Sequence, residues 1–117
     1  MNIEEIREYC ISKKGVIEVF PFDESTLVFK VMGKMFALTD LIDDLSINLK
    51  CDPEWAIELR EQHTAIQPGY HMNKNHWNTV KIDGTLSWPF ICKLIDHSYE
   101  LVVQKLPKKE QIELSNL

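Results

Sequence analysis

The amino-acid sequence predicts an α+β domain in which helices cover one face of an antiparallel sheet. The first observation is the stretch 27–51, which reads as two strands joined at a short turn, then a third strand with strict apolar/polar alternation. The second is a set of helical stripes that begin at good capping residues before and after that stretch. A sheet with one apolar face, covered by those helices, accounts for both patterns.

Length and composition fit a single domain. The chain has 117 residues, of which 44% are apolar and 26% charged, values that are ordinary for a globular protein. We expect residues 1–109 to form this domain and residues 110–117 to be a polar, frayed C-terminal tail. No apolar run approaches the roughly 18 residues that cross a membrane, and the acidic N-terminus lacks the features of a signal peptide.

The cysteines and the net charge narrow the class of protein. Three cysteines, far apart in the chain, do not suggest a disulfide framework, so we expect reduced thiols in a cytoplasmic protein. A net charge of −5 argues against a strongly basic nucleic-acid binder, although it is compatible with a local basic patch.

The chain begins with a predicted helix. Asn2 is a suitable cap, and Gly15 is a natural residue just past the end. The stripe expected to face the core is Ile3, Ile6 and Cys10. Residues 16–26 are predicted to be a connection, because Pro21 is unsuited to a central strand. The side chains expected to be buried there are Ile17, Val19, Phe20 and Phe22.

The next stretch is a predicted hairpin. Gly33 and Lys34 are expected to form a two-residue type II′ turn, with Gly33 in the first position. Val31 then faces Phe36. Alternation gives one apolar face: Leu27, Phe29, Val31, Phe36 and Leu38. The opposite face is Val28, Lys30, Met32, Met35, Ala37 and Thr39. In the third strand the inward residues are Leu45, Ile47, Leu49 and Cys51, and the outward ones are Ser46, Asn48 and Lys50.

Two more helices and one more strand complete the prediction. Asp52 is the cap and Pro53 the first residue of a helix that turns Ala56 and Leu59 toward the core. The segment 76–82, HWNTVKI, reads as the fourth strand. Ser87 caps a long last helix that Pro107 ends. Its expected buried stripe is Ile91, Leu94, Ile95, Ser98, Leu101 and Val102.

Four segments of the chain resemble the MmcQ/YjbR family of small bacterial proteins. They are GKMFAL, INLKC, PGYHMNKNHWNTVKID and SYELVVQKLPKK, which occur in the family's order between about Val28 and Lys109. The resemblance implies a frataxin-like, YjbR-like α+β fold, described for the family as a double-wing arrangement. It also implies a DNA-binding or other macromolecule-binding role.

The candidate binding residues lie on the sheet face away from the helices and in the loop before the fourth strand. They are Lys30, Lys34, Lys50, Tyr70, His71, Asn73, Lys74, His76, Trp77 and Lys81. Lysines with a tryptophan suit phosphate contact plus stacking on a base. Residues 63–82 contain no carboxylate, and we expect the acids of 40–44 and 52–61 on other sides of the molecule, leaving one continuous positive surface.

A structural interpretation stands beside each functional one. The lysines could merely solvate the sheet and discourage edge pairing, and loop 68–75 could cover Trp77 in a small second core. Cys51 precedes a helix N-terminus, which could lower its thiol pKa, but its strand position favours a buried, inert thiol. Ser98, with Tyr99, is expected to bond to backbone rather than act as a nucleophile.

No catalytic motif is present, so we expect a non-enzymatic binding protein without a cofactor. DNA, held weakly through its phosphates, is the partner that the resemblance implies. The alternatives are an adaptor that recruits another protein on the exposed sheet face, and a small-ligand protein that uses the His/Tyr/Lys loop. His63, His71 and His76 lack the spacing and thiolate partners of a structural zinc site, so no metal is expected. We expect no membrane association and a monomer or weak dimer.

Overall fold

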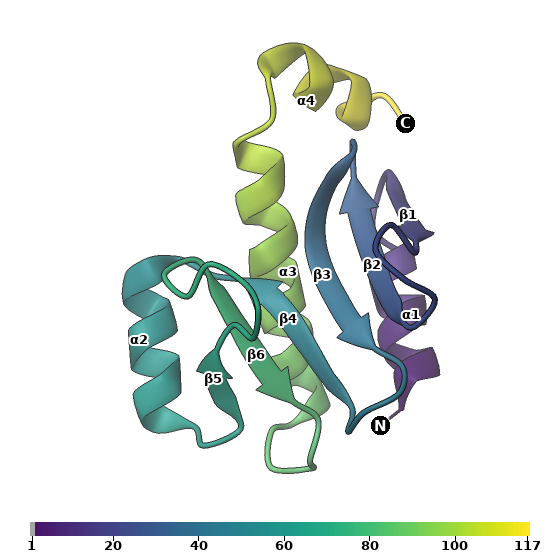
Figure 1. The fold of residues 1–117 in the computed structure, drawn as a ribbon. Coiled ribbons are helices and arrows are strands. Elements are labelled where there is room, and N and C mark those ends of the chain that lie inside the picture. Colours follow the sequence, from purple (N-terminus) through teal and green to yellow (C-terminus); the bar gives the residue numbers. More distant parts are fainter. Residues whose placement is uncertain (1) are drawn as a thin grey trace.

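A computed structural model describes residues 2–117, and within them six strands form one antiparallel sheet (Figure 1). The strands are β1 (Val16–Val19), β2 (Thr26–Val31), β3 (Lys34–Asp40), β4 (Ser46–Lys50), β5 (Ile66–Pro68) and β6 (Trp77–Lys81), and their order in the sheet is β1-β2-β3-β4-β6-β5. The helices are α1 (Ile3–Ile11), α2 (Pro53–Gln62), α3 (Trp88–Gln104) and α4 (Lys108–Ser115). The α+β class predicted from the sequence is confirmed.

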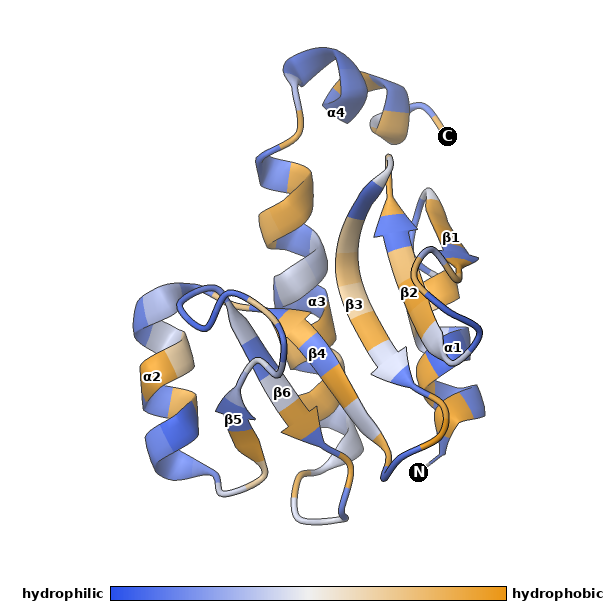
Figure 2. Ribbon diagram, in the orientation of Figure 1, coloured by the Kyte–Doolittle hydropathy of each residue, from blue (hydrophilic) through white to orange (hydrophobic). Residues whose placement is uncertain are grey.

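The helices share one core with one face of the sheet. Residues from α1, α2, α3 and α4 join the inward residues of β2, β3, β4 and β6 in a single buried cluster. The predicted stripes are largely confirmed, because the buried helix residues are Ile6, Cys10, Ala56, Leu59, Ile91, Leu94, Ile95, Ser98 and Val102. In Figure 2 apolar residues run along β2, β3 and β4, and β4 crosses in front of α3.

The predicted helix caps are also confirmed. The side chain of Asn2 accepts a hydrogen bond from the Glu5 amide at 2.9 Å, which satisfies one of the free donors at the start of α1. Asp52 accepts from the amide of Trp55, and Ser87 from the amide of Phe90, each at 3.3 Å. Short polar side chains in these positions therefore fix where the helices begin.

The turn of the β2–β3 hairpin differs from the prediction by one residue. Val31 pairs with Lys34, so the two loop residues are Met32 and Gly33, and Lys34 already belongs to β3. Both loop residues have positive φ, 49° for Met32 and 79° for Gly33, as a type I′ turn requires. The predicted type II′ turn at Gly33-Lys34 is therefore wrong. A type I′ turn matches the right-handed twist of the strands even though it places a methionine in the left-handed region.

A β-bulge then changes which residues of β3 face the core. Phe29 pairs with Ala37 and Lys30 with Met35, so Phe36 is the extra residue. As a result Phe36 and Ala37 both join the main core, whereas Leu38 turns to the opposite face with Val28. The prediction that Ala37 points outward and Leu38 inward is wrong, because strict alternation fails where one strand gains a residue.

Two short strands at the edges of the sheet were missed. Residues 16–19 of the predicted connection 16–26 form β1. The expected burial of Ile17, Phe20 and Phe22 is wrong, because these side chains are 56%, 50% and 64% exposed. The three-residue strand β5 pairs with β6 at the other edge. Strands this short carry too few residues for alternation to be recognised.

The residues predicted to be a frayed polar tail instead form α4. Its Leu114 is buried at 5% exposure and packs at Gly15, where the nearest atom of Leu114 lies 2.5 Å from the place that a Cβ would occupy. The helix follows Pro107 directly, and the amide nitrogen of the Gln111 side chain donates to the carbonyl of Leu106 at 2.8 Å. One buried leucine therefore anchors an otherwise polar helix.

Candidate functional site

The sheet face opposite the helices, here called the outer face, carries a second small core around Trp77. Trp77 is 9% exposed and packs with Val28 and Leu38. Met72, from the loop before β6, packs against the same cluster. The structural interpretation of Trp77 is therefore correct, and its ring supports the loop rather than offering a platform for a base.

Arg60 of α2 holds the loop 69–76 against the sheet. Its Nε donates to Oδ1 of Asn78 at 2.7 Å, and its Nη2 donates to the carbonyl of Lys74. The ammonium of Lys74 donates to the carbonyl of Gly69 at 3.2 Å, which closes the loop on itself. Lys74 therefore contributes to the structure of the loop.

Two further candidate residues, Asn73 and His76, also act mainly through this loop. The carbonyl of Asn73 accepts from the amide of Trp77 at 2.9 Å, and its side chain accepts from the amide of Asn75. The carbonyl of His76 accepts from the amide of Cys51 at 2.8 Å, which joins the loop to the end of β4. These contacts fix the loop in place.

Three lysines meet in a hollow of about 190 Å³ between the hairpin tip and the C-terminal end of α3, here called the basic hollow. Its lining residues are Lys34, Met35, Lys50, Val102, Lys105 and Leu106. Burial, and next the nearby ammonium of Lys105, lower the pKa of Lys50 below its usual value. The ion pairs formed by side chains within residues 2–117, Arg7–Glu18 and Lys13–Asp96, involve none of these lysines. This hollow therefore holds uncompensated positive charge.

A larger hollow of about 630 Å³ occupies the opposite end of the outer face, here called the acidic hollow. Its floor comes from the strands and includes Met35, Leu38, Asn48 and Thr79. One wall consists of Phe22 from the loop between β1 and β2, Asp40 at the end of β3, and Asp43 and Asp44 from the loop between β3 and β4. The facing wall is formed by Tyr70, His71 and Met72, and Lys81 is its one lysine.

A hydrogen bond from the Tyr70 amide to β6 fixes Tyr70 at the edge of this hollow, and the His71 ring lies against the Tyr70 ring. The amide of Tyr70 donates to Oγ1 of Thr79 at 2.9 Å, and that hydroxyl donates to Oδ1 of Asn48 at 2.5 Å. His71 adopts a φ of 58°, and its ring centroid lies 4.0 Å from that of Tyr70. Tyr70 itself is 70% exposed, so its ring is presented to solvent on a fixed backbone.

The lysines of the outer face therefore lie in two different charge environments. Lys34 and Lys50 come together with Lys105, whereas Lys81 lies in the acidic hollow with Asp43 and Asp44. The prediction that the acids of 40–44 lie on another side of the molecule is wrong, because the β3–β4 loop folds over the end of the outer face. Lys30 is on the outer face, where it pairs with Met35 of β3 and Ile17 of β1.

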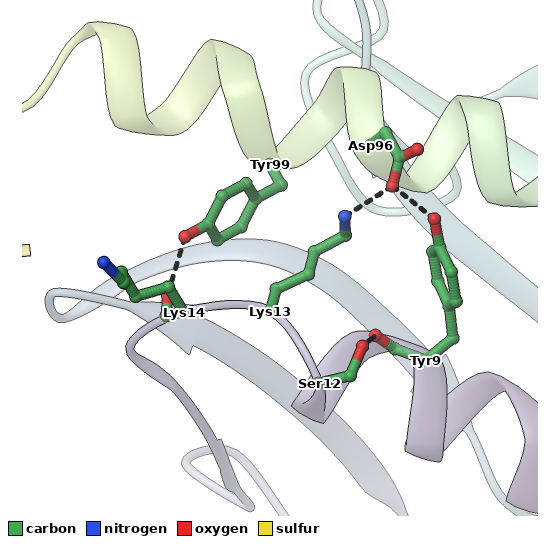
Figure 3. A network of polar contacts seen from close by, with 6 residues as sticks. All are labelled: Tyr9, Ser12, Lys13, Lys14, Asp96 and Tyr99. Carbon is green, nitrogen blue, oxygen red and sulfur yellow. Dashed lines mark hydrogen bonds and ion pairs between the residues drawn. The ribbon is translucent and has the colours of Figure 1, made fainter. Parts of the chain in front are cut away.

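A polar network on the helical side of the molecule has a structural role. Figure 3 shows Tyr9 and Lys13 directed at Asp96 of α3, whose Oδ1 accepts from the Tyr9 hydroxyl at 2.6 Å and pairs with the Lys13 ammonium. The hydroxyl of Tyr99 donates to the carbonyl of Lys14 at 2.6 Å. These contacts join α1 and the turn after it to α3.

Cys10, Cys51 and Ser98 are buried groups without a reactive environment. Burial raises the pKa of Cys51 to about 12 and the pKa of Cys10 to about 12. Ser98 donates to the carbonyl of Phe36 at 2.5 Å and accepts from the amide of Lys50 at 2.8 Å. The predictions of an inert Cys51 and a backbone-bonded Ser98 are therefore confirmed.

Residues 2–117 contain neither a candidate metal cluster nor a candidate membrane-spanning helix. No group of three or more His, Cys, Asp or Glu side chains in that range is arranged to hold a metal ion. In the same range no helix has the length and apolar character needed to cross a bilayer.

Sequence reasoning missed Lys105 and the acids of the β3–β4 loop. Lys105 ends α3, and the hairpin tip lies beside it only because of how α3 crosses the sheet. Asp43 and Asp44 follow β3 in the chain, but nothing in their spacing reveals that they face Tyr70 across a hollow. Neither arrangement leaves a signal in local sequence patterns.

Comparison with known proteins agrees with this architecture. The family model described as YjbR matches residues 11–101. The uncharacterized protein YjbR of Escherichia coli K12 is 36% identical over 112 residues, covering 95% of each chain. The uncharacterized protein YbdF of Escherichia coli O157:H7 is 39% identical over 93 residues, covering 79% of this chain and 76% of that protein.

Solved structures give the same result. A crystal structure of a Deinococcus radiodurans protein with a DUF419 domain superimposes with a TM-score of 0.92 at 44% identity, covering 97% of this chain and 88% of that one. A crystal structure of a Pseudomonas syringae protein gives a TM-score of 0.76 at 31% identity, covering 86% of this chain and 98% of that one.

Proposed function

This chain belongs to the YjbR family, and we propose that it is a non-enzymatic DNA-binding protein that holds backbone phosphates at the basic hollow. One observation carries the proposal. Lys34, Lys50 and Lys105 line the same hollow, and none of them has a carboxylate partner within residues 2–117. An anion placed among three ammonium groups relieves their mutual repulsion, which is the repulsion that helps to lower the pKa of Lys50.

The chemistry of the hollow suits phosphate better than it suits a base. Ammonium groups contact phosphate as point charges and carry no sequence information. Trp77 is buried and does not offer its ring for stacking. We therefore expect DNA binding that is weak, independent of sequence and steeply dependent on salt. Three lysine–phosphate contacts correspond to a slope of roughly −3 in a plot of log K against log salt.

Several groups that could have supported catalysis are engaged in the fold. Asp96 pairs with Lys13 and accepts from Tyr9. Cys51 has a raised pKa, and Ser98 is bonded at both its donor and acceptor positions. These contacts support the non-enzymatic part of the proposal.

The test is fluorescence anisotropy with labelled single- and double-stranded DNA at low salt. The variants Lys34→Gln, Lys50→Gln and Lys105→Gln should each weaken binding for every DNA sequence and reduce the magnitude of the salt slope by about one. The matched control is Lys93→Gln, which removes the same charge from an exposed position on α3. The proposal fails if the wild-type protein does not bind DNA, or if the control weakens binding as much as the three variants.

A further inference from the structure

The acidic end of the outer face combines exposed apolar side chains with carboxylates. Four large apolar residues, here called the apolar rim, are exposed: Phe20 at 50%, Phe22 at 64%, Leu41 at 45% and Ile42 at 78%. They come from two loops that lie side by side, because the Leu41 amide donates to the Ser25 carbonyl at 2.8 Å. Figure 2 shows apolar residues in the β3–β4 loop beyond the end of β3. A cluster of exposed apolar side chains beside a hollow is typical of a contact surface.

The charge of the adjoining hollow selects the kind of partner. Three carboxylates, Asp40, Asp43 and Asp44, line it against a single ammonium. Asp40 is partly used by the fold, since its Oδ1 accepts from the Ile42 amide at 2.8 Å. Asp43 and Asp44 are exposed, and neither takes part in a hydrogen bond or ion pair with another residue of 2–117. A cationic group placed there gains two partners without breaking any contact of the fold.

The rest of the hollow suits side chains of mixed chemistry. Its floor includes Met35, with Met72 at its side, and methionine side chains adapt to apolar groups of different shapes. Tyr70 presents an exposed ring on a pinned backbone across from the carboxylates. A tyrosine ring also attracts a lysine or arginine through its face.

The extent of the surface indicates a polypeptide rather than a small molecule. A hollow of 630 Å³ would hold a small ligand. Phe20, Leu41 and Ile42, however, do not line the hollow, and such a ligand would leave them exposed. A polypeptide can enter the hollow and cover the apolar rim at the same time.

We propose that the acidic hollow and the apolar rim together bind a basic, apolar-containing segment of another protein. A lysine or arginine of that segment lies between Asp43, Asp44 and Tyr70, and a neighbouring apolar side chain packs on Met35. Further apolar side chains cover the apolar rim. This interface shares only Met35 with the basic hollow and includes none of its lysines, so it does not depend on DNA binding.

The probe is a fluorescein-labelled peptide of about ten residues in which lysine and leucine alternate. Extended, it spans roughly 33 Å, about the 32 Å middle dimension of the molecule. Anisotropy titration should show that the wild-type protein binds this peptide. It should bind weakly or not at all to a peptide with glutamate in place of lysine, or with serine in place of leucine.

Two outer-face variants, each with a matched control on α2, test whether peptide binding depends on this surface rather than on net charge or non-specific apolar contact. Asp43→Asn with Asp44→Asn should weaken peptide binding about five- to tenfold, whereas Glu58→Gln with Glu61→Gln, which removes the same charge from α2, should not. Ile42→Ser should weaken binding several-fold, and Ile57→Ser should not, although Ile57 on α2 is 55% exposed. The triple variant Lys34→Gln, Lys50→Gln, Lys105→Gln should bind the peptide as the wild type does.

Each of several outcomes would overturn the proposal. The first is that the wild type does not bind the lysine–leucine peptide. The second is that the outer-face variants and their α2 controls lose equal affinity for it. Sedimentation analysis, which measures self-association, tests a further outcome of this kind. If the wild type self-associates, and Asp43→Asn with Asp44→Asn abolishes that association while the peptide does not bind, the surface is occupied by a second copy of this chain.

Discussion

The two ends of the outer face share a sheet but differ in charge. At the end near the hairpin tip, Lys34 and Lys50 meet Lys105, and no carboxylate lines the hollow. At the other end the β3–β4 loop brings Asp43 and Asp44 beside the outer face. Met35 lines both hollows, so they are neighbours on one surface.

The comparison shows which parts of the fold set the chemistry. The strands supply the floor of each hollow through apolar and small polar side chains. The charge comes from residues at the ends of the strands, from the β3–β4 loop and from the end of α3. Sheet alternation therefore predicts that the outer face is a surface, but not the sign of its potential at either end.

The largest effect is expected at Phe36, the extra residue of the bulge that determines which side chains of β3 face the core. Phe36 is fully buried in the main core, so Phe36→Ala should lower the free energy of unfolding by about 3–5 kcal/mol. Because both hollows rest on this core, the variant should lose DNA binding and peptide binding at the same temperature as it is warmed. Chemical denaturation measures the change, with Phe22→Ala as the control, because Phe22 is 64% exposed and should cost less than about 0.5 kcal/mol. Equal effects of the two variants would contradict the burial of Phe36 in the main core.

The next effect concerns the hairpin tip that borders only the basic hollow. Gly33 has a φ of 79°, and apart from its two chain neighbours no residue comes within 4 Å of a Cβ added there, so a side chain is opposed by the backbone conformation alone. Gly33→Val should therefore destabilise the protein by about 1–3 kcal/mol in a thermal melt. Asparagine tolerates positive φ, so Gly33→Asn should be close to the wild type. A valine variant as stable as the asparagine variant would show that the turn lies elsewhere.

The two ends can be compared directly through one lysine from each. Lys50→Gln should weaken DNA binding about five- to tenfold at low salt. Lys81→Gln should change it less than about twofold, because Lys81 lies among three carboxylates that also repel phosphate. Anisotropy titrations of both variants measure the difference. If Lys81→Gln has the larger effect, DNA lies at the acidic end and our assignment is reversed.

The smallest expected effect is a pH dependence that only the basic hollow should show. The pKa of Lys50 is lowered from 10.5, so as the pH rises Lys50 loses its proton before a lysine of ordinary pKa does. As the pH is raised from neutrality toward 10.5, the DNA affinity of the wild type should therefore decline more than that of Lys50→Gln. Lys93→Gln should follow the wild type. Parallel pH profiles for wild type and Lys50→Gln would argue against a role for this ammonium.

Much of the fold could be predicted because it rests on local patterns. Asn2, Asp52 and Ser87 cap their helices as predicted. Ile47 and Leu49 of β4 face the core, as alternation predicted. The candidate site was predicted less well. Lys34 and Lys50 do come together, but Lys74 is bonded within its loop and Trp77 is covered.

The sequence by itself determined the helices, the central strands and the apolar face they share, because capping and periodicity act between residues close in the chain. Only the tertiary structure decided the bulge at Phe36, which depends on how two strands pair, and the strands β1 and β5, which exist through their neighbours. It also decided that Leu114 docks α4 at Gly15 and that loops place carboxylates at one end of the outer face and leave lysines at the other. These features join residues distant in the chain, and the free energy that fixes them comes from packing rather than from local preference.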